Sequence, residues 1–186
     1  MPKILVTEEQ WVQLGVELFS TGGADALVVE KMAKQLKCSK SSFYWYFKDR
    51  ESFLHKIFEH WRKLATEAVI RTVETSQTPA DKIRTLLTTM FEHRQGNDFM
   101  FYLRRLGQRE NGYREALEAI EDQRMAYFSS LLQEAGCPRQ AAREKAELVY
   151  HYYLGWFERS KQIVLDDEEV GRQVKLIWEH VLNFHP

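Results

Sequence analysis

The stretch from Val28 to Leu54 constrains this chain more than any other part of its sequence. It predicts two short helices joined by a tight turn, followed by the start of a longer helix. The first short helix carries four apolar residues at spacings that place them on one face: Val29, Met32, Ala33 and Leu36. The segment Lys37-Cys38-Ser39 breaks this pattern, and the Ser39 hydroxyl is expected to cap the next helix near Ser42.

The second short helix, from Lys40 to Phe47, has an unusual composition for a surface helix. Phe43 and Phe47 can anchor it inward. The remaining side chains then present donors and flat rings outward: Lys40, Ser41, Ser42, Tyr44, Trp45 and Tyr46. A helix that lies in the major groove of DNA needs phosphate contacts and base-edge contacts together. The pattern therefore predicts a helix-turn-helix with Lys40–Phe47 as its recognition helix.

The charge of the chain is unevenly distributed. The formal net charge of −1 argues against an indiscriminate nucleic-acid binder. Residues 31–50, however, contain six Lys or Arg and one Asp, a local charge of +5 that leaves −6 for the rest. Charge alone leaves open a solvated lysine-rich face. The aromatic residues among these charges favour a basic, sequence-specific DNA surface on an acidic body.

Residues 7–54 resemble the DNA-binding domain of the tetracycline-repressor (TetR) family of bacterial transcription regulators. The resemblance rests on short matching segments: Leu18-Phe19, Gly22-Gly23, Met32-Ala33, Cys38-Ser39-Lys40, the aromatic run from Phe43 to Phe47, and Arg50-Glu51-Ser52-Phe53. In the family these segments form helix one, the helix-turn-helix pair and the entry to helix four. The resemblance implies a one-component regulator, most often a repressor.

Three positions depart from the residues that are usual in the family. Lys37 replaces the turn glycine, Arg50 replaces the lysine after the aromatic end, and Val28 replaces the threonine that often starts helix two. Val28 removes a side-chain cap and a phosphate contact, whereas the first two changes are expected to leave the fold intact.

The 186 residues predict an all-α protein of about nine helices. Hydrophobic residues make up 44% of the chain, and no strand-like alternation persists. We expect a three-helix DNA-binding domain at residues 1–50 and an effector-binding and dimerisation domain at 51–186. No apolar run is long enough for a membrane span, the first ten residues do not resemble a signal peptide, and two cysteines suggest no disulfide framework. These features predict a cytoplasmic protein.

Local signals predict where several helices begin. Thr7 opens the first with a capping box that ends at Gln10, and Asp49 caps the fourth, which is expected to run to about Arg71. Thr78-Pro79 starts the fifth. Pro138 starts the eighth, and Asp166 caps the ninth.

The last two predicted helices, eight and nine, carry more apolar surface than one core face can absorb. Their large residues include Tyr152, Tyr153, Trp156, Phe157, Val174, Ile177 and Trp178. Such a helix is either central in a core or shared with a partner. The family resemblance implies the second, a homodimer through helices eight and nine.

The body also holds an excess of large rings. Each of them can simply fill the core. The family resemblance implies a pocket for a small apolar or aromatic effector, with these candidate lining residues: Trp61, Phe91, His93, Phe99, Tyr102, Phe128, Tyr153 and Trp156.

An enzyme and a helical adaptor are the alternative interpretations. His55/Glu59 and Glu147/His151 have helical i, i+4 spacing, but two ligands do not make a metal site, and no catalytic or metal motif accompanies them. An adaptor leaves Tyr44-Trp45-Tyr46 unexplained. We therefore expect no catalytic residue, metal or cofactor, and a regulator that binds a near-palindromic operator in double-stranded DNA. Lys40, Ser41, Ser42 and Trp45 are its candidate groove contacts, and Tyr44, Tyr46, Lys48 and Arg50 its candidate phosphate contacts.

Overall fold

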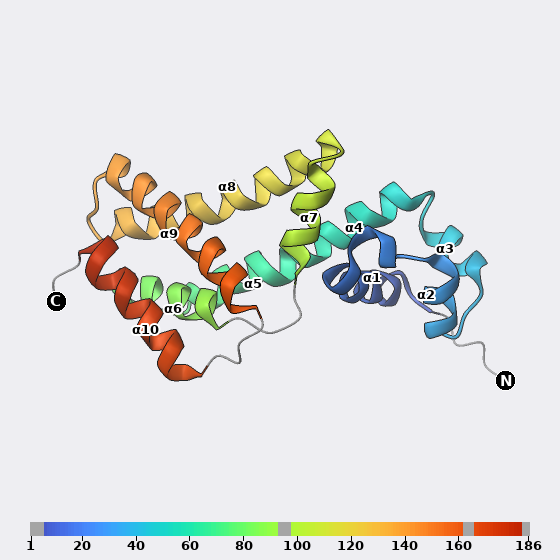
Figure 1. Ribbon diagram of the computed structural model, residues 1–186, viewed down its shortest axis with the longest axis horizontal. Helices are drawn as coiled ribbons and strands as arrows, with labels where there is room; N and C mark the ends of the chain where they lie inside the picture. Colours follow the sequence, from blue (N-terminus) through green and yellow to red (C-terminus); the bar gives the residue numbers. More distant parts are fainter. Residues whose placement is uncertain (1–5, 93–97, 162–165, 184–186) are drawn as a thin grey trace. The chain divides into compact units, whose positions relative to one another are not determined.

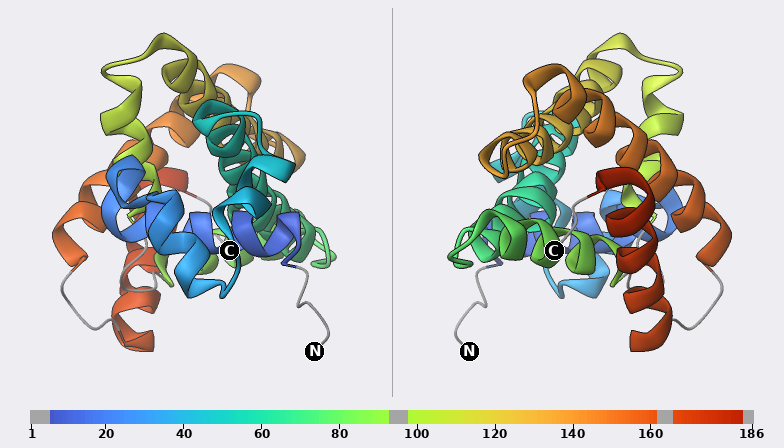
Figure 2. Two further views of the ribbon diagram at one scale, coloured as in Figure 1. Left: turned by 90° about the vertical axis from the view of Figure 1, so that its right-hand side faces the viewer. Right: turned by 90° about the vertical axis from the view of Figure 1, so that its left-hand side faces the viewer.

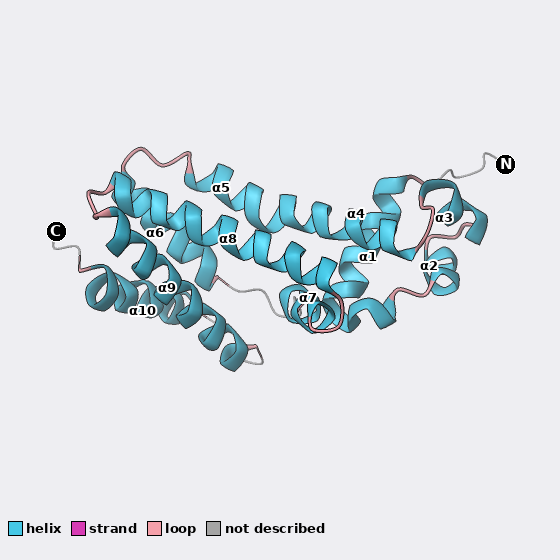
Figure 3. Cartoon of the chain, turned by 90° about the horizontal axis from the view of Figure 1, so that it is seen from above, coloured by secondary structure: helices cyan, strands magenta, loops and turns pink. Residues whose placement is uncertain are grey.

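The computed structural model describes residues 6–92, 98–161 and 166–183, and every regular element in these ranges is helical (Figures 1 and 3). The α-helices are α1 Glu8–Gly22, α2 Val29–Gln35, α3 Lys40–Tyr46, α4 Arg50–Arg62, α5 Ala68–Val73, α6 Pro79–Phe91, α7 Phe99–Gly107, α8 Asn111–Glu134, α9 Arg139–Ser160 and α10 Asp167–Ile177. The all-α prediction is confirmed. The predicted fourth helix spans both α4 and α5, which brings the labelled helices to ten.

The chain forms two compact units. The first contains Met1–Ala65 and Gly96–Glu118, and the second contains Thr66–Gln95 and Ala119–Pro186. Both α8 and the helical run from α4 to α5 continue from one unit into the other along the chain. The functional division after residue 50 that the sequence suggests stays a prediction.

Aromatic rings form the core of the first unit. Phe43 of α3 meets Trp11 of α1 edge-on, with ring centroids 5.3 Å apart, and Phe53 of α4 at 5.0 Å. Gly15 lets α1 approach α4, because a Cβ atom there would lie only 2.6 Å from Ile57 Cδ1. These buried contacts hold α3 against α1 and α4, and α2 packs against α3. Figure 2 (left) shows α1–α3 in blue.

Helix α7 also belongs to the first unit, where it docks on the end of α1. The Tyr102 hydroxyl donates to the Thr21 carbonyl at 2.9 Å, and the Asp98 N–H donates to the Ser20 carbonyl at 3.1 Å. Gly23 ends α1 with a φ of 64°, and a Cβ there would lie 2.6 Å from Tyr102 Cδ1. The predicted stop at Gly22-Gly23 is confirmed, and it also makes room for α7.

The predicted helix starts are confirmed at four caps. Thr7 and Asp49 each form a capping box, with Gln10 and Ser52, and the Thr78 and Asp166 side chains each accept a backbone N–H of the following turn. The prediction for Ser39 is wrong in its mechanism. Ser39 precedes α3, but its hydroxyl pairs with Ser41 Oγ at 2.7 Å, and the Ser42 N–H donates to the Ser39 carbonyl instead.

The turn between α2 and α3 is a Schellman motif built around Lys37. The Cys38 N–H donates to the Ala33 carbonyl at 2.9 Å, and the Lys37 N–H donates to the Lys34 carbonyl at 3.2 Å. Lys37 itself has a φ of 54°, in the left-handed region where glycine is favoured. The departure from the family's glycine therefore keeps the turn geometry but places a side chain in a strained conformation.

The helical run from Arg50 to Val73 confirms the predicted long helix, with one irregularity. A π-helical turn, Lys63–Glu67, separates α4 from α5. Thr66 in this turn is buried, and its hydroxyl accepts from Arg124 Nε of α8 at 3.0 Å.

The second unit has its own apolar core, made mainly by α6, α8, α9 and α10. Polar contacts join α9 to α10 at its edge. The Tyr152 hydroxyl donates to Gln173 Oε1, and Gln173 Nε2 donates to Glu169 Oε1 at 2.8 Å. Arg172 also binds Glu169 through two nitrogens, which lowers the pKa of this carboxyl from 4.5 to about 2.

We predict that Lys37→Gly raises the free energy of unfolding by about 0.5–1 kcal/mol. The left-handed conformation costs a side-chain-bearing residue about 1–2 kcal/mol, and the greater freedom of glycine in the unfolded chain offsets part of the gain. Lys37→Ala is the matched control, since it removes the same charge but keeps Cβ. Denaturant unfolding of both variants measures the difference. Equal stability of the two would contradict a left-handed Lys37.

Candidate nucleic-acid interface

The orientation of α3 is set by its two buried phenylalanines. Phe43 and Phe47 are almost fully buried, with ring centroids 4.9 Å apart, and Phe47 also packs on Phe53 at 4.7 Å. Because these residues lie four positions apart, they fix one face of the helix inward. Exposed residues occupy other positions of α3 and the turn that follows it: Lys40, Ser41, Tyr44, Trp45 and Lys48.

Trp45 and Tyr44 expose unusually large aromatic surfaces. The Trp45 side chain is 84% exposed and Tyr44 is 63% exposed. Tyr44 touches Phe43 only edge-on, with centroids 5.3 Å apart, so its ring face stays open. Exposed rings of this size on one helical turn have no part in the core and are available to a partner.

Two of the predicted contact residues also hold the first unit together. Ser42 is half-buried, and its hydroxyl accepts from Trp11 Nε1 at 3.3 Å. Tyr46 is half-buried as well, and its hydroxyl donates to the Val6 carbonyl at 3.0 Å. Their DNA contacts stay predictions, but both hydroxyls already have partners within the protein.

Lys40, the first residue of α3, and Arg50, the first residue of α4, also have partners within the protein. Lys40 Nζ lies 2.7 Å from Glu30 Oε1 of α2. This hydrogen-bonded pair raises the pKa of Lys40 and lowers that of Glu30. The Arg50 guanidinium donates to the Ala24 carbonyl. It keeps further N–H donors that can reach a phosphate, since a guanidinium carries five.

The remaining charges around the turn are basic and exposed. Lys31, Lys34 and Lys37 face solvent on α2 and the turn. Asp49 is occupied as the cap of α4, where the Ser52 N–H donates to it at 2.8 Å and lowers its pKa. The surface therefore combines exposed aromatic rings, hydroxyls and a net positive charge, which is the chemistry that a DNA groove requires.

The structure divides the predicted effector residues between the two units. Trp61, Phe99 and Tyr102 belong to the first, where Trp61 and Phe99 stack in parallel with centroids 4.4 Å apart. The second unit contains the others that are described: Phe91, Phe128, Tyr153 and Trp156. There the Phe91 ring lies 4.9 Å from Trp156 and 6.0 Å from Tyr153. His93 lies outside the described residues.

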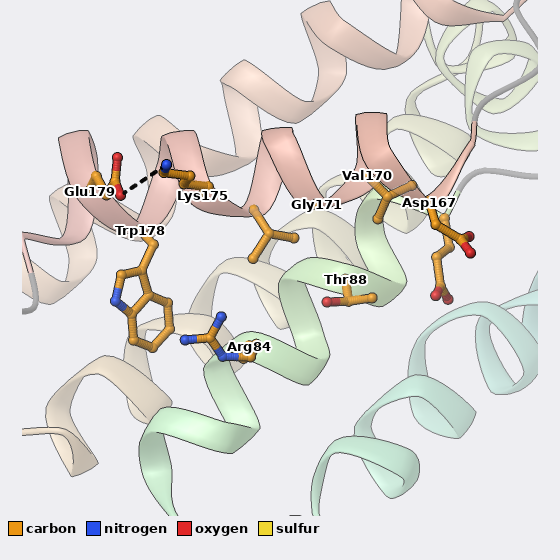
Figure 4. Close-up of a pocket in the computed structure, with 10 residues that line it drawn as sticks. Arg84, Thr88, Asp167, Val170, Gly171, Lys175, Trp178 and Glu179 are labelled. Carbon is orange, nitrogen blue, oxygen red and sulfur yellow. Dashed lines mark ion pairs between the residues drawn. The ribbon is translucent and has the colours of Figure 1, made fainter. Parts of the chain in front are cut away.

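An open groove of about 600 Å³ lies between α6 and α10 in the second unit (Figure 4). Arg84 lies over the Trp178 ring at one end, 4.7 Å from its centroid. Thr88 and Gly171 line it along the two helices, with charged residues around them: Glu92, Asp167, Lys175 and Glu179. None of the predicted effector residues lines this groove, and the sequence pattern did not indicate it.

The described residues contain neither a group that could bind a metal ion nor a helix that could span a membrane. Within the described ranges, no group of three or more His, Cys, Asp or Glu could hold a metal ion. His55, Glu59, Glu147 and His151 are exposed. No helix in this part of the chain is long and apolar enough to cross a membrane.

Residues 12–57 match the family model of the bacterial regulatory proteins of the tetR family. The match begins in α1, contains the whole of α2 and α3, and ends in α4 at Ile57. It thus covers the surface described above. This segment is similar to the tetR family of bacterial regulatory proteins. The resemblance read from the sequence is confirmed, as is DNA binding through a helix-turn-helix.

Solved structures of transcriptional regulators share the fold over nearly the whole chain. A transcriptional regulator from Rhodococcus sp. Rha1 is 13% identical, with a TM-score of 0.80 over 97% of this chain and 100% of that one. A TetR regulator from Legionella pneumophila is 11% identical, with a TM-score of 0.78 over 96% and 99%. FadR from Bacillus subtilis, in complex with stearoyl-CoA, is 18% identical, with a TM-score of 0.67 over 96% and 100%. No curated protein matches this regulator.

We predict that Trp45→Ala weakens binding to an operator selected from random DNA by about 1–3 kcal/mol, roughly 5- to 150-fold. Its exposure means that the stability should change by less than about 0.5 kcal/mol. Tyr46→Phe should instead lower the free energy of unfolding by about 1 kcal/mol, because it removes the hydrogen bond to Val6. Fluorescence anisotropy and denaturant unfolding measure the two effects. Unchanged DNA affinity in Trp45→Ala would remove α3 as the recognition helix.

Proposed function

We propose that this regulator is a homodimeric repressor that binds a near-palindromic operator and leaves it when an apolar or aromatic effector binds. The exposed face of α3, with Trp45 and Tyr44 beside Lys40 and Ser41, is the observation that carries the proposal. Two such helices in successive major grooves read two half-sites about one helical turn apart. Tyr44, Tyr46, Lys48 and Arg50 are proposed to contact phosphates.

We propose regulation rather than catalysis as the activity. Its relatives by family model are regulatory proteins, and the aromatic, basic face of α3 suits binding to DNA. The protein is proposed to act in the cytoplasm, where a bacterial regulator of this kind meets its DNA. DNA binding is assigned to residues 1–50 and effector binding and dimerisation to 51–186.

The proposed dimer forms through α9 and α10. Leu148 of α9 is 57% exposed, and Gly155, seven residues later on the same face, is exposed too. Open space surrounds Gly155, because an added Cβ would meet no heavy atom within 4 Å. An exposed leucine beside an open glycine favours close contact with a second helix. The polar link between Tyr152 and Gln173 keeps α9 and α10 together as one surface.

We expect Gly155→Glu to yield a folded monomer that has lost specific operator binding. The open space accommodates the new side chain within one protomer, whereas a charge buried between two copies is costly. A single half-site then supplies too little affinity. Gly112→Glu is the matched control, since Gly112 of α8 is also exposed and open. Sedimentation and operator binding are measured at micromolar protein. A wild-type monomer under these conditions would contradict the proposed dimer.

The effector is proposed to be apolar or aromatic because of the rings available to it. Phe91, Phe128, Tyr153 and Trp156 give the second unit an aromatic interior, and Tyr153 carries a polar tip that can orient a ligand. The B. subtilis FadR structure contains stearoyl-CoA, which supports fatty acyl compounds as one class to examine. Effector contacts of Trp61, Phe99 and Tyr102, which belong to the first unit, and of His93 stay predictions from the sequence.

The effector proposal predicts that one compound class both changes Trp fluorescence and releases the operator. Release requires that the ligand prefer the DNA-incompetent conformation by about 1–3 kcal/mol, a 5- to 150-fold loss of DNA affinity. Fatty acyl-CoAs, planar aromatics and hydrophobic cations are titrated against the protein and against its operator complex. Tyr153→Phe should weaken the response if its hydroxyl orients the ligand. Ligands that alter fluorescence but leave operator affinity unchanged would contradict the switch.

A further inference from the structure

Only two acidic residues lie between Val28 and Arg50, and the structure gives them different positions. Asp49 is occupied as the cap of α4. Glu30 lies in the first turn of α2, and its carboxylate reaches across the helix-turn-helix to the first residue of α3, Lys40, at 2.7 Å. The side chains of the pair are 60% and 55% exposed, so both reach solvent on the surface proposed to meet DNA.

A negative charge at this place is unfavourable for binding to DNA in general. Every phosphate repels a carboxylate, and Glu30 also neutralises one of the cations that would attract phosphates. The acid has one structural use, because an acidic residue in the first turn of a helix interacts well with the helix dipole. That use requires a carboxylate at Glu30 but does not require the ion pair with Lys40.

The pair distinguishes a base edge from a phosphate by charge. A lysine ammonium has three donors, so Lys40 can keep Glu30 and still donate to a neutral acceptor such as guanine O6 or N7. A phosphate is anionic, and beside Glu30 its attraction to Lys40 is largely cancelled. An unpaired lysine, in contrast, is a flexible point charge that binds the phosphates of any sequence.

We propose that Glu30 is a specificity-determining residue, which positions Lys40 for base contacts and keeps it from indiscriminate phosphate contacts. The residue acts through Lys40 and need not touch DNA itself. This inference rests on the proposed function, in which Lys40 faces the major groove. It adds a residue of α2 to that function and assigns it a role against non-operator DNA.

The test compares Glu30→Gln with wild type on operator DNA and on random-sequence DNA over a range of salt concentrations. Without the carboxylate, Lys40 is free to bind a phosphate. Affinity for random DNA should rise about two- to five-fold at 0.1 M salt, as expected for the release of an exposed ion pair. The salt slope on random DNA should steepen by about 0.9, the value for one additional phosphate contact. Operator affinity should change less than two-fold, so the specificity ratio falls.

Three further variants separate the ion pair from a general effect of charge. Glu59→Gln removes an exposed carboxylate from α4 and should leave the specificity ratio unchanged. Glu30→Asp keeps the charge but shortens the reach to Lys40, so the ratio should still fall. In a Lys40→Gln background, Glu30→Gln should no longer alter the ratio. Circular dichroism and thermal unfolding of each variant confirm that α2 and α3 are intact.

Other outcomes would overturn the inference. An equal rise on both DNAs would make Glu30 a general repulsive charge. A fall on the operator alone would make Glu30 a direct base contact. Persistence of the effect in the Lys40→Gln background would exclude Lys40 as its intermediary. Wild-type protein that binds neither DNA would instead refute the proposed function, and this inference with it.

Discussion

Burial of Phe43 and Phe47 decides what α3 can do. Their rings pack against Trp11 and Phe53, at centroid distances of 4.7–5.3 Å, and so tie the short helix to α1 and α4. A helix of seven residues has little stability of its own, so its orientation comes from this packing. Because the inward face is fixed, Trp45 must point outward, where its ring is available to a partner.

The packing around α1 extends beyond the residues that match the family model. Helix α7 docks on the end of α1 through Tyr102 and Gly23, so a segment from the middle of the chain completes the first unit. Tyr102 and Phe99 were predicted to line an effector pocket. Here both contact Phe19 of α1, and Phe99 stacks on Trp61 of α4. A ligand that disturbs these rings would act directly on the helices that support α3.

Two cations of the basic surface already have partners within the protein, so fewer charges are available to DNA than the sequence contains. Lys40 is held by Glu30, and Arg50 by the Ala24 carbonyl. Asp49 is itself committed to capping α4, whereas the carboxylate of Glu30 pairs with Lys40. Such intramolecular partners favour binding to a specific sequence over binding to DNA in general. Each cation binds DNA well only where the DNA offers a stronger interaction than its partner within the protein.

The sequence by itself determined the helical class, the caps at Thr7, Asp49, Thr78 and Asp166, and the exposed ring of Trp45. These features depend on residues three or four positions apart, so local spacing is enough to predict them. Only the tertiary structure decided that Ser42 bonds Trp11 and that Tyr46 bonds Val6, partners that lie 31 and 40 residues away in the chain. It likewise decided the pairing of Lys40 with Glu30 and the docking of α7. Each of these contacts requires two helices to be brought together, and their packing, rather than any local pattern, selects the partner.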